Sequence, residues 1–127
     1  LSVLNQVGVR VLVLAPNPEM IYPPRQCIGL RKGSYCDVPR VVNEKFLGDT
    51  TLALEEVVNR YPNARLAHLM DFFCDAQTCF AARDGKILAY DENHITASAA
   101  RDLGRFLAAD LDWLLGKSAV MGSVSQH

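Results

Sequence analysis

The stretch VRVLVLA, residues 9–15, decides the fold class of this chain. It is short, rich in β-branched residues and almost continuously apolar, and Pro16 and Pro18 end it. A run of this kind is typical of a strand that is buried on both faces of a parallel sheet. We therefore expect a central strand here, in an α/β fold.

A helix is predicted after this strand. Apolar side chains recur at helical spacing over residues 41–61, and Pro62 marks a stop. Gly48 and Asp49 interrupt the pattern, which predicts a short helix, a turn, and a longer helix that begins near Thr50 or Thr51. The main apolar positions at this spacing are Leu52, Val57 and Val58, with Leu54 and Tyr61 beside them.

The remaining apolar runs predict further elements of a layered α/β domain. Residues 65–73, RLAHLMDFF, have strand length, and His68 within them is expected to be a core histidine. Residues 16–39 are rich in proline, glycine and polar residues, which predicts a long loop with little regular structure. A turn dipeptide at residues 84–85 precedes a short apolar run at 87–90. Alternating strands and helices favour α/β layering.

The last predicted element is one helix over TASAARDLGRFLAADLDWLL, residues 96–115. Thr96 or Ser98 can cap its start, and Gly116 ends it. We expect one domain over residues 1–115 and a mobile tail over residues 116–127. The apolar face of the helix consists of Ala99, Leu103, Phe106, Leu107, Leu111 and Leu114.

Composition restricts the class of protein. The 127 residues are 50% hydrophobic, as in one ordinary globular domain. A formal net charge of −1 predicts no general attraction to nucleic acid or to an anionic membrane. No stretch of the sequence approaches the roughly 20 apolar residues that a membrane span requires, and the first ten residues lack the basic start and long apolar segment of a signal peptide. Since it begins at Leu1 and soon enters a strand-like run, we expect a piece of a longer protein.

The four cysteines occur as two local pairs. Cys27 lies near Cys36, and Cys74 lies near Cys79. Four cysteines permit three pairings, of which we predict the nearest-neighbour one. Each disulfide would stabilise the fold by roughly 2–3 kcal/mol in a loop-closure account, and only in an oxidising compartment.

Two alternatives for the cysteines remain open at this point. All four thiols could be reduced in the core or in loops. Cys74, Cys79 and either His68 or His94 could bind zinc, although four intervening residues are outside the commonest short ligand spacings. A dithiol redox centre would use Cys-x-x-Cys, which is absent.

The residues with the clearest chemical potential are Asp91 and His94 in the predicted loop Asp91-Glu92-Asn93-His94. A carboxylate and an imidazole three residues apart in a loop can converge on one point. A histidine with pKa near 6.5 can accept a hydroxyl proton at neutral pH, and a carboxylate on its other nitrogen fixes the tautomer. The alternative is a polar turn that caps the next helix.

The surrounding block FCDAQTCFAARDGKILAYDENHITASAA, residues 73–100, resembles the end of an SGNH/GDSL-type hydrolase domain. It is most similar to the SGNH domain fused to the C-terminus of bacterial acyltransferase-three membrane proteins. The resemblance runs over residues 9–115. Residues 95–99, Ile-Thr-Ala-Ser-Ala, replace the commoner Leu-Ser-x-x-Gly but keep a small, cappable helix start. The matching positions are Cys74, Cys79, Tyr90, Asp91, His94, Thr96 and Ala99.

This resemblance implies a three-layer α/β fold, a parallel sheet flanked by helices, of which the chain holds only the C-terminal portion. It makes His94 the general base that activates a serine, and Asp91 the group that orients His94. The serine, in a Gly-Asp-Ser block, and the oxyanion glycine and asparagine are expected upstream of Leu1. Gly48-Asp49-Thr50 only superficially resembles that block and is interpreted as a helix start. With strands missing, the chain could associate with its own copy.

The function that follows is part of an O-acyltransferase or esterase acting on acyl groups, in particular acetyl, of cell-surface polysaccharide. The resemblance implies a periplasmic or cell-surface location, no cofactor, an acylated glycan or acyl donor as partner, and membrane attachment only through an N-terminal domain. We expect the 127-residue chain alone to be inactive. The alternative is a non-catalytic extracytoplasmic module that binds glycan or protein, and a cytoplasmic thiol protein is a third possibility.

Overall fold

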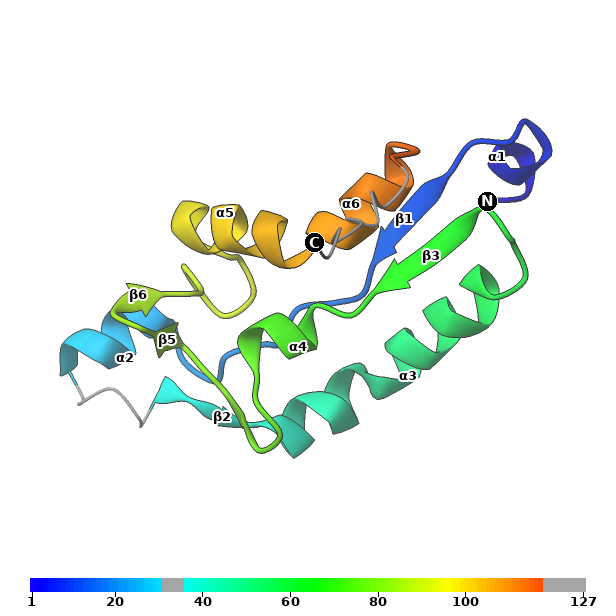
Figure 1. Ribbon diagram of the computed structural model, residues 1–127. Coiled ribbons are helices and arrows are strands. Elements are labelled where there is room, and N and C mark those ends of the chain that lie inside the picture. Colours follow the sequence, from blue (N-terminus) through cyan, green and yellow to red (C-terminus); the bar gives the residue numbers. More distant parts are fainter. Residues whose placement is uncertain (31–35, 118–127) are drawn as a thin grey trace, which may run out of the picture.

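The computed structural model describes residues 1–30 and 36–117. Its centre is a parallel pair of strands, β1 (Val11–Leu14) and β3 (Ala64–Ala67), aligned over their whole length. Helix α3 (Arg40–Val58) makes the crossover that a parallel pair requires (Figure 1). A mixed α/β fold with a parallel pair is therefore confirmed, although this sheet has only two strands within the described residues.

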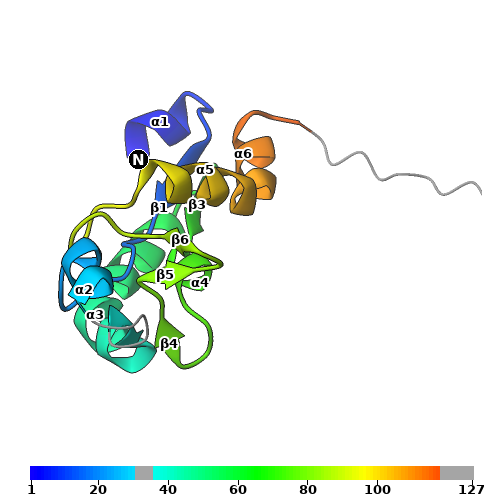
Figure 2. The same ribbon diagram turned by 90° about the vertical axis from the view of Figure 1, so that its left-hand side faces the viewer.

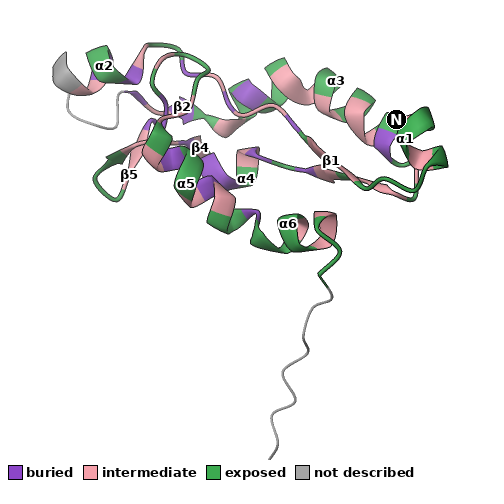
Figure 3. Cartoon of the chain, turned by 90° about the horizontal axis from the view of Figure 1, so that it is seen from above, coloured by how far each residue is buried: buried purple, intermediate pink, exposed green. Residues whose placement is uncertain are grey.

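Helices lie on both sides of the pair. Helix α3 lies on one side, and α5 (Ala97–Phe106) and α6 (Ala108–Leu114) lie on the other (Figures 2 and 3). Among these, α3 contacts β3 and α6 contacts β1. A short helix, α1 (Ser2–Gln6), precedes β1. Within the described residues, no helix has both the length and the apolar content needed to cross a membrane.

The prediction that the first strand is buried on both faces was wrong. Residues 11–13 are only partly buried, and Leu14 is 49% exposed. The sequence pattern is that of a central strand, but within the described residues β1 pairs with β3 alone. A two-stranded sheet offers too little surface to bury both faces of a strand.

Helix α3 is continuous, so the predicted turn at Gly48 and Asp49 was wrong. Glycine inside a helix costs only about 1 kcal/mol relative to alanine, a cost that a 19-residue helix with tertiary contacts can offset. The predicted apolar face is also only partly buried. Val58 is buried, whereas Leu52 is 63% exposed because α3 covers a narrow sheet.

The apolar run at residues 65–73 does not form one strand. Strand β3 ends at Ala67, and α4 (Met70–Phe73) follows, which turns Phe72 and Phe73 into the core. His68 lies at the junction with its side chain 47% exposed, 3.5 Å from a carboxylate oxygen of Glu55 on α3. The expectation of a core histidine was wrong, because the strand ends before His68.

The long segment between β1 and α3 contains more regular structure than predicted. Helix α2 (Pro24–Leu30) begins at a proline, which is well suited to a first helical turn. Strand β2 (Val38–Pro39) then pairs with β4 (Thr78–Cys79). The predicted turn at residues 84–85 is confirmed, since it joins β5 (Ala82–Arg83) to β6 (Lys86–Ile87). Both turn residues have positive φ, 52° and 73°.

Both predicted disulfides are present. Cys27 pairs with Cys36, and Cys74 pairs with Cys79. The first bond ties α2 to the residues before β2, and the second ties the end of α4 to β4. All four sulfur atoms are therefore used, which does not support the reduced-thiol or zinc alternatives. Within the described residues, no three histidine, cysteine or acidic side chains are grouped to hold a metal.

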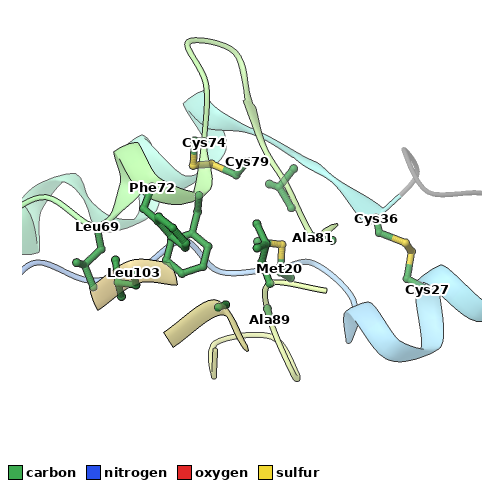
Figure 4. Close-up of a cluster of buried hydrophobic side chains, with 14 of the residues drawn as sticks. Met20, Cys27, Cys36, Leu69, Phe72, Cys74, Cys79, Ala81, Ala89 and Leu103 are labelled. Carbon is green, nitrogen blue, oxygen red and sulfur yellow. A yellow bond between two sulfur atoms is a disulfide. The ribbon is translucent and has the colours of Figure 1, made fainter. Parts of the chain in front are cut away.

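The hydrophobic core lies beyond the carboxyl ends of β1 and β3 and includes both disulfides (Figure 4). Phe72 and Phe73 meet edge to face with ring centroids 4.9 Å apart. Leu69 and Leu103 lie beside Phe72 in the same view. The buried members of the cluster are Met20, Cys27, Cys36, Val38, Ala67, Leu69, Phe72, Phe73, Cys74, Cys79, Ala81, Leu88, Ala89, Ala99, Leu103 and Leu107.

The C-terminal helix is divided at Leu107, where one continuous helix was predicted. The break buries Leu107 in the core and allows α6 to turn toward β1. Thr96 caps α5, since its Oγ1 accepts a hydrogen bond from the N–H of Ala99 at 3.2 Å. Gly116, with φ of 72°, follows α6 as expected. Residues 118–127 of the predicted mobile tail lie outside the described residues.

The Thr96 cap gives a first prediction. Thr96→Ala should lower the free energy of unfolding by about 1 kcal/mol, because α5 loses its cap and the carbonyl of Ile87 loses the hydroxyl donor at 2.8 Å. Ser98→Ala is the matched control, since the Ser98 hydroxyl bonds only to that of Thr96 among the described residues. Urea unfolding measures both variants. Equal losses would contradict the assignment of the cap to Thr96.

The disulfides give a second prediction. Replacing either pair by alanine should lower the free energy of unfolding by roughly 2–3 kcal/mol through loop-closure entropy. Sequence separations of 9 and 5 residues predict the larger loss for Cys27 and Cys36. Denaturant unfolding of the two double variants provides the measurement. A double variant as stable as the original chain would show that its bond is dispensable for folding.

Candidate active site

The loop at residues 91–94 is a tight reversal between β6 and α5. Ala89 and Ile95 form an isolated antiparallel bridge at its base, and Tyr90 N–H donates to the carbonyl of His94 at 2.6 Å. The residues on either side are anchored, since Ala89 and Ala99 are both buried. The predicted loop is confirmed, and its two ends are fixed by the core.

Asp91 organises this loop internally. Its Oδ1 accepts hydrogen bonds from the backbone N–H groups of Asn93, at 3.0 Å, and His94, at 2.7 Å. These two donors are the main reason why the pKa of Asp91 lies below its usual value, and the His94 ring lowers it further. The carboxyl group is therefore ionised at neutral pH. Aspartate favours such turns because its short side chain reaches the backbone two and three residues ahead.

Asp91 and His94 also meet through their side chains. Nδ1 of His94 lies 2.9 Å from Oδ2 and 3.0 Å from Oδ1 of Asp91. A proton on Nδ1 satisfies the carboxylate and leaves Nε2 unprotonated. The His94 side chain is 77% exposed, and Nε2 has no hydrogen-bond partner among the described residues. The pair can accept a proton at Nε2 and stabilise the resulting imidazolium.

Residues that follow β1 hold the loop from outside. Asn17 donates from Nδ2 to the carbonyl of Asn93 at 3.0 Å, and Met20 N–H donates to that of Glu92 at 2.7 Å. The dyad is thus attached to the carboxyl end of β1, the edge at which open α/β sheets bind ligands. Sequence reasoning missed Asn17, although its place directly after a strand was an available signal.

An aromatic ring and a cation lie beside the dyad. Tyr90, which precedes Asp91, is 53% exposed, and the guanidinium carbon of Arg25 lies 4.9 Å from its ring centroid. The cation–π contact brings α2 next to the loop.

The other residues considered from the sequence lie elsewhere. Thr50, in the Gly-Asp-Thr segment, lies inside α3, so the interpretation of this segment as a helix start was wrong. His68 pairs with Glu55 rather than with the dyad. In the part of the chain that the structure describes, no hydroxyl group is hydrogen-bonded to the His94 ring.

The ionised Asp91 carboxylate lies on Nδ1 of the exposed His94 ring, in an α/β fold. This arrangement makes the site a candidate acid/base dyad. The family model of the SGNH domain (fused to AT3 domains) matches residues 1–109. The chain therefore belongs to this family, which is one of esterases and acyltransferases, and the resemblance stated from the sequence is confirmed. No curated protein and no solved structure matches the chain significantly.

The Asp91 contacts give a third prediction. Since backbone N–H groups contribute most, the Asp91 carboxyl should titrate below the ordinary value of 3.8 even in His94→Ala. A depressed carboxyl pKa stabilises the fold above the unfolded-state pKa, and this contribution is lost as pH falls through the folded-state pKa. The amide signals of Asn93 and His94 should move in the same acidic range. Carboxyl ¹³C NMR titration measures it, and an ordinary pKa in the original chain would contradict these contacts.

Proposed function

We propose that Asp91 and His94 are the acid/base part of a Ser-His-Asp triad in an O-acyltransferase or esterase. Its substrates would be acyl groups, in particular acetyl, on cell-surface polysaccharide. The observation that carries the proposal is the contact between His94 Nδ1 and the ionised Asp91 carboxylate, with Nε2 open to solvent. Family membership supplies the reaction class.

In this reaction Nε2 of His94 removes the proton of a serine hydroxyl while the serine oxygen attacks the acyl carbonyl carbon. Asp91 keeps Nδ1 protonated and stabilises the imidazolium. His94 then returns the proton to the departing alkoxide, and an acyl-serine ester remains. An acceptor sugar hydroxyl or water, deprotonated by the same nitrogen, releases the acyl group and regenerates the serine.

The proposal assigns the nucleophile and the oxyanion donors to other parts of the protein. The 127 residues contain no Gly-Asp-Ser block. A base without its nucleophile leaves little of the catalytic effect of an intact triad. The chain alone is accordingly inactive in this proposal, and esterase turnover by the chain that His94→Ala abolishes would overturn this assignment.

The two disulfides support a location outside the cytoplasm, because such bonds persist in oxidising compartments. We place the domain on the periplasmic or cell-surface side of a bacterial membrane, where a polysaccharide acceptor is accessible. The partner is an acylated glycan or an acyl donor, which would bind to the complete protein that contains this chain.

The fourth prediction concerns activity of the complete natural protein that contains this chain. His94→Ala and Asp91→Ala should each lower kcat by at least about 10³-fold, because the triad acts as a unit. His68→Ala is the matched control, since His68 is another exposed histidine on a carboxylate and lies outside the dyad. It should change kcat by less than about twofold. Release or transfer of acetyl from an acetylated glycan is the measurement.

The rival function has a distinct result in the same assay. A non-catalytic module that binds glycan or protein would keep its binding and cellular acylation after replacement of both Asp91 and His94. Unchanged acylation in those variants would therefore exclude the triad. Loss of acylation together with retained glycan binding would support it.

A further inference from the structure

Asn43 on α3 is the one polar residue that is buried in the described part of the chain. Its exposed fraction is 2%. A buried amide destabilises a fold unless its donors and acceptors are paired. Both ends of this amide bond to the same residue, Glu19, in the segment after β1. Oδ1 accepts from Glu19 N–H at 2.7 Å, and Nδ2 donates to the Glu19 carbonyl at 3.1 Å.

The hydrogen bonds continue from Asn43 to the loop of the dyad. The Glu19 carbonyl belongs to the same peptide group as the Met20 N–H, which donates to the carbonyl of Glu92 at 2.7 Å. One peptide group therefore accepts from Asn43 on one side and donates to Glu92 on the other. Hydrogen bonds joined through a peptide group polarise and strengthen one another.

A parallel contact restrains the next residue of the loop. Asn17, in the same segment, donates to the carbonyl of Asn93 at 3.0 Å. The segment at residues 17–20 thus binds two loop carbonyls, while Asp91 binds two loop N–H groups. The backbone between Asp91 and His94 is held from both sides, and the His94 ring is held through its Nδ1 contact with Asp91.

We propose that Asn43 is a positioning residue for Asp91 and His94, acting through the segment at residues 17–20. This inference rests on the proposed function for its catalytic meaning. Asn43 touches none of the reacting groups. It fixes the Glu19–Met20 peptide, which in turn fixes the loop and the orientation of His94 Nε2.

An alternative is that the buried side chain of Met20 anchors the segment by packing alone. In that case loss of Asn43 would affect stability without a selective effect on the loop. A test must therefore separate a local change at the loop from a general loss of stability.

The test is amide hydrogen exchange and NMR on this chain with Asn43→Ala. We expect the exchange protection of Met20 N–H to fall about tenfold more than that of Ala15 N–H, which bonds to Ala67 between the strand ends. The His94 ring resonances should shift at the same time. Asn59→Ala, an exposed asparagine that ends the same helix, should alter neither signal.

Two results would overturn the inference. One is unchanged Met20 protection and His94 resonances, and the other is equal loss of protection at Met20 and Ala15. If Asn43→Ala fails to fold, Asn17→Ala tests the parallel contact, and the His94 resonances must then shift. Unchanged His94 ring resonances in Asn17→Ala would also reject the proposal that the segment at residues 17–20 positions the loop.

Activity separates this inference from the proposed function. In the complete protein, Asn43→Ala should lower kcat about tenfold with KM changed less than about twofold, because orientation rather than binding is lost. If His94→Ala retains activity, the proposed function fails whatever Asn43→Ala does. If His94→Ala is inactive and Asn43→Ala has full kcat, only the positioning role fails.

Discussion

The narrow parallel sheet is the constraint on which the rest of this structure depends. Two paired strands cannot bury both of their faces, so Leu14 remains half-exposed and α3 contributes few buried side chains. The core forms instead around α4 and the start of α5, beyond the ends of the strands, and both disulfides are part of it. The cross-links stabilise a small core by restricting the unfolded chain.

The position of this core explains why an exposed loop can have a defined shape. The loop at residues 91–94 leaves the core at Ala89 and returns to it through the helix capped by Thr96. Between these points the Asp91 carboxylate accepts hydrogen bonds from two backbone N–H groups. The segment after β1 donates hydrogen bonds to two backbone carbonyls. The His94 ring can therefore be exposed for chemistry while its backbone is restrained, an arrangement suited to a preorganised base.

Much of the fold could be predicted from the sequence, and the failures have common physical causes. Apolar pattern located β1 and the helix regions. It could not show that β1 pairs with β3 alone in the part of the chain that the structure describes, or that Gly48 lies within a continuous helix. The run at residues 65–73 has the composition of a strand, yet packing of Phe72 and Phe73 favours a helical turn there. Local pattern located the apolar segments, whereas both the type of element and its burial depended on which surfaces were available.

The candidate site shows the same division. The sequence by itself determined the Asp-x-x-His spacing, the cysteine pairs and the family, because these depend on residue identity and on contacts within a few positions. Only the tertiary structure decided that Nε2 of His94 faces solvent. It also decided that Asn17 bonds to Asn93, 76 residues away, and that Asn43 bonds to Glu19, 24 residues away. Contacts between distant residues leave no local periodicity in a sequence, since they arise only when the chain packs.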